Sequence, residues 1–215
     1  MKSFFGDGFG FWLLAHEWSN NNFLAFEIDQ TGVSTSPIIS SVGTVHGVGQ
    51  EDENFGTVFN FSEAIGQLKI SPDGNKIATA KKGGSNSGIE IFDFNSSTGV
   101  VSNPILINEP FVDDVSEISG AYGIEFSGNS DLLYVTDYIP SQDFVSRVHQ
   151  FNLTVSDVNS ITNSDTIIHS SESILGALQL AIDGKIYVSN FSKTSCFIKI
   201  ANEKPQYGHF TTRTK

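Results

Sequence analysis

Apolar and polar residues alternate on both sides of a turn in residues 66–80, which predicts two short strands. Leu68 and Ile70 alternate with polar neighbours before the turn, and apolar residues resume at Ile77. Residues 71–74 are Ser-Pro-Asp-Gly, in which proline presets φ at the first central position and glycine accepts a left-handed φ. The segment is therefore predicted to be a β-hairpin.

The same pattern returns twice, in residues 122–137 and 176–190. The residues that open the three turns are Ser71, Ser127 and Ala181, and they are separated by steps of 56 and 54 residues. A step of such constant length indicates a structural repeat.

Each of the first two hairpins is followed by two further strand-like runs, within residues 89–107 and 147–169. One repeat therefore holds four short strands. Repeats of four antiparallel strands with a period of roughly 50 residues are typical of the blades of a β-propeller. The sequence thus predicts an all-β fold, a partial β-propeller of about four blades of four-stranded antiparallel sheets.

The two ends of the chain match the repeat only in part. Residues 11–43 align with the second, third and fourth strands, so the first strand of that blade is predicted to be absent. After residue 202 no blade pattern follows. The expected organisation is a leader, four blades and an unpatterned tail, at residues 1–10; 11–43, 66–108, 120–169 and 174–202; and 203–215.

Two arrangements of these blades compete, a closed four-bladed ring and an arc cut from a larger ring. The arc is favoured because both ends of the pattern stop within a blade. The terminal sheets of an arc would expose apolar faces that a neighbour should cover. We therefore expect the isolated chain to self-associate, with other blades or domains of a larger chain as its natural partners.

The strand order places the long connections together at one end of the disc. The hairpin turns and the turns between third and fourth strands are short and should share the opposite end. Binding residues tend to lie on long loops of this kind. We expect a loop-rich face formed by residues 44–65, 81–88, 108–120 and 138–146.

A glycine-flanked histidine and two acidic runs fall on this predicted face. The acidic runs do not match the alternating D-x-D-x-D-G pattern of a calcium loop, so solvated loops are favoured and Ca²⁺ stays the alternative. No other cofactor or metal is predicted. The candidate binding residues are His46, Glu51, Asp52, Glu53, Asp113, Asp114 and Glu117.

Charge and composition exclude several classes of partner. The chain has 24 acidic and 12 basic residues and a formal net charge of −12, which disfavours nucleic acids and anionic lipids. Cys196 is the single cysteine, so an internal disulfide is excluded. The first residues lack the continuous apolar run of a signal peptide, and no run is long enough to span a membrane.

No motif for catalysis is present. The five histidines show no metal-binding spacing, and His16 is not part of an H-E-x-x-H motif although Glu17 follows it. His16 lies between strand residues and is predicted to be packed, whereas the loop around His46 can present that side chain to solvent. Nucleophile elbows and P-loops are absent. No catalytic residue is predicted.

Several segments together carry a family resemblance that spans residues 11–191: FWLLAHEWSNNNFLAFEID, GQLKISPDGNKIATA, IEIFDFNSSTGVVSNPI, YGIEFSGNSDLLYVT and GALQLAIDGKIYVSN. They resemble the WD40/YVTN-like propeller region of large secreted surface proteins of gliding bacteria. Those proteins often end in a gliding-motility-associated or type IX sorting domain. The resemblance implies a propeller of about seven blades. It also implies an extracellular or cell-surface scaffold or adhesion module, whose ligand would be a protein or a polysaccharide.

The sequence favours a non-enzymatic scaffold or binding module over an enzyme. The alternative is an enzyme of the lactonase or quinoprotein amine dehydrogenase-like propellers, whose sites lie at the centre of the disc. The polar residues that the first strands offer to such a channel are Gln67, Lys69, Glu125 and Gln179. A shared cluster with a raised carboxylate pKa would favour an enzyme, and solvated scatter would favour a scaffold.

Overall fold

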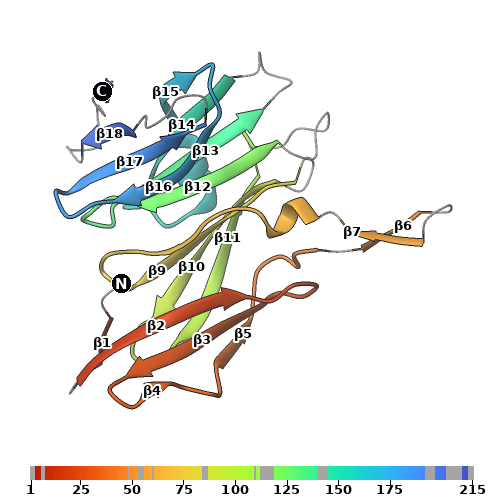
Figure 1. Cartoon of the computed structure of the whole chain (residues 1–215), viewed down its shortest axis with the longest axis vertical. Helices are drawn as coiled ribbons and strands as arrows, with labels where there is room; N and C mark the ends of the chain where they lie inside the picture. Colours follow the sequence, from red (N-terminus) through yellow and green to blue (C-terminus); the bar gives the residue numbers. More distant parts are fainter. Residues whose placement is uncertain are drawn as a thin grey trace.

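Short antiparallel strands make up almost all of the regular structure in the computed structural model of this chain (Figure 1). The structure describes residues 3–5, 8–47, 49–52, 56–59, 61–83, 87–108, 110–111, 119–139, 145–191, 197–201 and 210–212. The strands form one five-stranded sheet, three four-stranded sheets and a separate two-stranded hairpin.

The second and third sheets correspond to the two repeats that the sequence analysis found complete. In the second sheet the strands are β8 (Leu68–Ile70), β9 (Lys76–Lys81), β10 (Gly88–Asn95) and β11 (Val100–Ile107). In the third sheet they are β12 (Gly120–Phe126), β13 (Leu132–Ile139), β14 (Val145–Asn152) and β15 (Thr166–Ser171). Each strand pairs antiparallel with the next along the chain, as a propeller blade requires. A short helix, α1 (Val158–Asn163), is inserted between β14 and β15.

The repeated hairpin turns share one backbone geometry. Gly74, Ser130 and Gly184 occupy the same place in the three turns and have φ of 76°, 66° and 74°. Each donates its backbone N–H to the residue that opens the turn, at 2.9, 2.9 and 3.0 Å. The predicted hairpins are thus confirmed, and a left-handed residue is required in each of them.

The terminal sheets are more complete than predicted. The first contains β1 (Ser3–Phe5), β2 (Gly8–His16), β3 (Asn22–Asp29), β4 (Gly32–Val33) and β5 (Ile38–Ser41). The last contains β16 (Leu175–Leu180), β17 (Lys185–Asn190), β18 (Phe197–Ala201) and β19 (Phe210–Thr212).

Two boundaries expected from the sequence are therefore wrong. Residues 1–10 were expected to be a leader and the first strand of that blade to be absent, but β1 pairs with β2. Residues 203–215 were expected to be an unpatterned tail, but β19 lies within them and pairs with β18. Backbone pairing of three residues is enough to extend an exposed sheet edge, and it leaves almost no hydrophobic pattern in so short a strand.

The long connection at residues 44–65 also has structure of its own. It contains the hairpin β6 (Gly49–Asp52) and β7 (Gly56–Phe59), followed by the 3₁₀ helix η1 (Phe61–Ala64). In Figure 1 this hairpin extends away from the stacked sheets.

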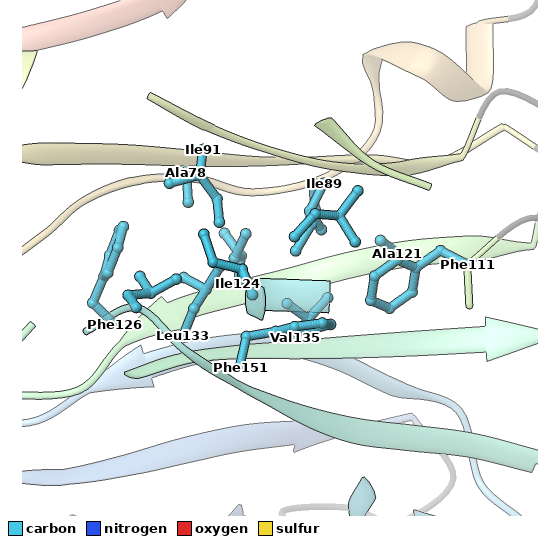
Figure 2. Packing of buried hydrophobic residues seen from close by; sticks show 14 residues of the cluster. Ala78, Ile89, Ile91, Phe111, Ala121, Ile124, Phe126, Leu133, Val135 and Phe151 are labelled. Carbon is cyan, nitrogen blue, oxygen red and sulfur yellow. The ribbon is translucent and has the colours of Figure 1, made fainter. Parts of the chain in front are cut away.

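Three hydrophobic clusters lie between successive sheets. Trp12 and Phe23 of the first sheet meet Phe92 of the second. Ile89 and Ile91 of the second meet residues of the third, as Figure 2 shows. The third cluster joins residues of the third and last sheets, and its fully buried members are Leu178, Ile186, Val188 and Val148. Burying each such side chain stabilises the stack by about 1.5–3 kcal/mol.

The sheets are arranged as an open arc. The first sheet lies at one end of the stack and the last sheet at the other, with the second and third between them (Figure 1). The fold is therefore a partial β-propeller. Among the described residues, no helix has the length and apolar character that crossing a membrane needs.

Candidate functional site

Strands β8, β12 and β16 lie at one edge of their respective sheets and pack against one another. Each is the first strand of a repeat, so equivalent positions of three blades meet at this shared inner edge. An edge strand leaves a row of backbone groups without ladder partners. The inner edge is where the sequence analysis placed four polar side chains.

Gln67 ties three sheets together. Its side-chain Oε1 accepts hydrogen bonds from the backbone N–H of Ile124 at 3.1 Å and of Leu178 at 2.8 Å. Both amides follow a register shift in their strand, between Ala121 and Ile124 in β12 and between Leu175 and Leu178 in β16. A bulge disrupts the ladder locally. One amide oxygen therefore satisfies the same irregular position in two neighbouring blades.

Lys69, Glu125 and Gln179 form a second link between the same sheets. The Lys69 Nζ donates to Glu125 Oε2 at 2.9 Å and to Gln179 Oε1 at 3.0 Å. Glu125 Oε2 also accepts the backbone N–H of Leu180 at 2.9 Å, and Oε1 accepts that of Phe126 at 3.1 Å. The side chain of Lys69 is 16% exposed and that of Glu125 is 6% exposed, so the ion pair is shielded from solvent.

A close backbone approach accompanies these links. Thr136 Oγ1 accepts the N–H of Gly123 and donates to the carbonyl of Gly176, both at 2.8 Å. A Cβ added to Gly123 would lie 2.4 Å from the Gly176 oxygen, so a side chain at this position would push the third and last sheets apart.

Of the two arrangements left open by the sequence, a shared cluster and solvated scatter, the structure shows Gln67, Lys69, Glu125 and Gln179 close together. Each of these side chains forms at least one hydrogen bond to a residue of another blade. The arrangement can hold three sheets in register. That these residues line an open central channel stays a prediction.

His46 is not presented to solvent, and that expectation is wrong. The residue is only 6% exposed, and its ring stacks on that of His16 with centroids 4.0 Å apart. Its backbone N–H donates to the Asn20 carbonyl at 3.2 Å, and its carbonyl accepts the N–H of Ser19 at 2.8 Å. These bonds fold the loop down onto the first sheet, which buries the ring.

The histidine pair lies next to a buried carboxylate. His46 Nε2 is 3.5 Å from Glu90 Oε2, which is an electrostatic contact and too long for a hydrogen bond. The two carboxylate oxygens of Glu90 accept the N–H and the hydroxyl of Thr44 at 2.9 and 2.8 Å. Burial and, to a smaller extent, the neighbouring His46 lower the pKa of His16 to about 4, so His16 is neutral at physiological pH. The cluster is a polar part of the packing between the first two sheets.

The side chains of the six acidic candidates lie outside the described part of the structure. Glu51 and Asp52 lie on β6, where the backbone alone is described. The remaining acidic candidates, Glu53, Asp113, Asp114 and Glu117, lie outside the described residues. Within the part of the chain that the structure describes, no group of three or more His, Cys, Asp or Glu could hold a metal ion. A binding role for the acidic loops stays a prediction.

A buried histidine that contacts two carboxylates was not predicted from the sequence. His149, on β14, is 1% exposed and lies between two carboxylates. Its Nε2 is 3.1 Å from Asp137 Oδ2, and its Nδ1 is 3.0 Å from each carboxylate oxygen of Asp165. Asp137 also accepts the backbone N–H of Arg147 at 2.7 Å. Asp165 follows α1, so the inserted helix carries it to the sheet.

This triad holds a charged imidazole inside the third sheet. Burial alone would lower the pKa of His149, but the hydrogen bonds and charges of Asp137 and Asp165 outweigh it and raise the pKa to about 9. The imidazolium donates to both carboxylates and leaves no ring nitrogen free to act on a ligand. The sequence feature that could have indicated this cluster was a histidine at an inward-facing position of a predicted strand.

Comparison with known proteins supports the fold alone. No protein-family model matches the chain, and no curated protein does so. A solved structure of a proposed 6-phosphogluconolactonase from Bacteroides uniformis is similar, with a TM-score of 0.51, 17% identity, and coverage of 94% of this chain and 53% of that one. Hydrazine synthase from Kuenenia stuttgartiensis gives a TM-score of 0.53 at 10% identity, with 92% and 51% covered. A Lactobacillus plantarum protein gives 0.50 at 15% identity, with 94% and 52% covered.

The chain spans about half the length of these solved structures. At such low identity, what the neighbours catalyse cannot be transferred. The sheet order, the repeated turns and these neighbours together establish that the chain is a partial β-propeller.

Proposed function

We propose that this chain is a set of propeller blades that serves as a non-enzymatic scaffold or binding module. One observation carries the proposal. At the shared inner edge, the polar side chains are occupied in bonds that join the blades. They are placed to fix the geometry of the stack and leave its loops to make contacts with partners.

The same bonds argue against catalysis at this edge. A general base must reach the proton that it abstracts, directly or through one water. The Glu125 carboxylate instead accepts the Lys69 ammonium and two backbone N–H groups. Lys69 in turn is held by Glu125 and Gln179, so it is not a free nucleophile. A lactonase-like activity therefore has no supporting residue here.

An extracellular or cell-surface location belongs to the same proposal, as does a protein or polysaccharide ligand. Both are supported by the resemblance to propellers of secreted gliding-motility proteins and type IX cargo. The net charge of −12 supports a partner that is neither nucleic acid nor an anionic membrane.

The test compares hydrolysis with stability. The wild-type chain and the Lys69→Met variant are assayed for hydrolysis of 6-phosphogluconolactone and for thermal unfolding, with Lys185→Met as a control that removes an equal charge outside the inner edge. We expect no hydrolysis above the buffer rate and a clear fall in Tm for Lys69→Met alone. Hydrolysis by the wild type that Lys69→Met abolishes at unchanged Tm would contradict the proposal.

A further inference from the structure

A cavity of about 430 Å³ opens between the third and last sheets. It lies at the end of the stack that carries the long connections, because its lining comes from where β12 and β16 begin and where β13 and β17 end. The volume is within the range of small-molecule sites. The residues that matter for its chemistry are Lys82, Tyr122, Tyr138, Ile174 and Phe191.

Three sheets contribute to this cavity. Lys82 follows β9 of the second sheet and forms an isolated bridge with Gly120 of the third. Tyr122 lies on β12, and its carbonyl accepts the backbone N–H of Gln67 at 2.9 Å. On the other side, the Phe191 N–H donates to the Ile174 carbonyl at 3.0 Å, which closes the mouth of the last hairpin. The cavity is therefore built by the same contacts that join the blades.

The lining is apolar and aromatic around a single cation. Phe191 is 88% exposed and Ile174 is 41% exposed, so large apolar side chains stand at the opening without cover. The Lys82 Nζ lies 5.7 Å from the centroid of the Tyr122 ring, within the range of a cation–π contact. Burial lowers the pKa of Lys82, which shows that its surroundings disfavour the charge. Within the part of the chain that the structure describes, no salt bridge reaches Lys82.

We propose that this cavity binds a small ring-bearing monocarboxylate, with the ring against Phe191 and Ile174 and the carboxylate on Lys82. A carboxylate would compensate the partly buried ammonium, and the face of a ring would cover apolar side chains that now face water. Because Lys82 is the one cation among the described residues that line the cavity, a ligand with one carboxylate matches the cavity. The net charge of −12 disfavours a polyanion, so an acidic polymer does not fit as well as a single acid.

The inference rests on the proposed function, since it gives the non-enzymatic module a ligand. Calorimetric titration tests it with two acids, 4-hydroxybenzoate and glucuronate, each beside its neutral methyl ester. The two acids separate an aromatic ring from a sugar ring. The variants are Lys82→Met, Phe191→Ser and the control Lys185→Met, which removes an equal charge from the last sheet outside the cavity. Thermal unfolding verifies that each variant is folded.

We expect at least one acid to bind at least tenfold more tightly than its ester. Lys82→Met should weaken binding of the acid by tenfold or more and leave the ester unchanged, whereas Phe191→Ser should weaken both. Lys185→Met should match the wild type. Equal binding of acid and ester, binding insensitive to Lys82→Met, or no binding of either acid would overturn the inference. Recovery of chemically altered ligand would instead contradict the proposed non-enzymatic function.

Discussion

The free face of the first sheet and the free face of the last sheet differ in their chemistry, although both end the same stack. The free face of the first sheet is apolar. The register pairs Phe11 with Ile28, Leu13 with Phe26, and Leu24 with Ile39, and side chains of paired residues lie on the same side of a sheet. Leu13 is 49% exposed and Ile39 is 59% exposed.

The free face of the last sheet is polar where its side chains are described. It carries Lys185, Tyr187 and Ser189, which alternate with the buried Ile186 and Val188. Lys185 and Tyr187 both bond to Asp183, at 2.8 and 3.0 Å. This face makes its own polar network and resembles a surface.

The difference indicates on which side another sheet should pack. Each of the three internal junctions contains an apolar cluster with members from both sheets, and the free face of the first sheet resembles these clusters whereas that of the last does not. We therefore expect association through the first sheet. In a solution of this chain alone, we expect a second copy to cover this face.

Two lysines on the free face of the first sheet should weaken self-association, and this is the largest effect that we expect. In a Leu13→Lys/Ile39→Lys double variant, the apolar contribution of two large side chains is lost, roughly 4 kcal/mol. This corresponds to a rise in the dissociation constant of about 1000-fold. Sedimentation equilibrium measures it. Association as strong as that of the wild type would show that the first face is not the contact.

Removing the side chain of Gln67 should loosen the last sheet, because the described contacts of that sheet with the other blades lie on its inner side. Gln67→Leu leaves the N–H groups of Ile124 and Leu178 without an acceptor, at a cost of about 3 kcal/mol in the free energy of unfolding. Urea unfolding measures this cost. Hydrogen exchange should accelerate first at Leu178, and faster exchange in β2 or β3 instead would contradict this order.

His149 of the third sheet and the partly buried His16 of the first sheet should make the free energy of unfolding depend on pH in opposite directions. For His149 the folded pKa of about 9 exceeds the unfolded value of 6.5, so its stabilisation is complete below pH 6.5 and is lost as pH rises through 9. The amount is on the order of 3 kcal/mol. For His16 the folded pKa of about 4 is depressed, so its contribution is present above pH 6.5 and is lost as pH falls through 4.

Urea midpoints measured at pH 5, 7 and 9 test these two opposite pH dependences. His149→Gln should flatten the alkaline decline, and His16→Gln should flatten the acidic one. If the urea midpoint of His149→Gln still falls at alkaline pH, other groups cause that fall.

A lysine on the free face of the last sheet should have the smallest effect on stability and on self-association. Ser189→Lys introduces the same side chain as the double variant, at an exposed position at the edge of the cavity between the third and last sheets. Its effect on the free energy of unfolding should stay within about 0.5 kcal/mol. The dissociation constant should not change, and a large increase would mean that both faces take part in association.

The fold could be predicted because its signal is local and repeated. Ser71-Pro-Asp-Gly and its two counterparts specify a turn through residues that are adjacent in the sequence, and the structure shows the same hydrogen bonds in all three. Aligning these repeats identified Gln67, Lys69, Glu125 and Gln179 as candidates at the first strands, but it left open whether they form one cluster or lie apart.

The missed features depend on contacts between distant residues. Asp165 reaches His149 because α1 is inserted between β14 and β15. The sequence contains no spacing pattern that predicts this insertion. His46 has the glycine-flanked setting of an exposed loop, yet backbone bonds to residues 19 and 20 bury it. Strands β1 and β19 have three residues each, too few to show alternation.

Small-angle X-ray scattering of the non-associating Leu13→Lys/Ile39→Lys variant tests the open arc most directly. An elongated stack with the first and last sheets at opposite ends should give a skewed distribution of interatomic distances that matches the structure (Figure 1). A symmetric distribution from a compact disc would show that the four blades close on themselves and would contradict the arc.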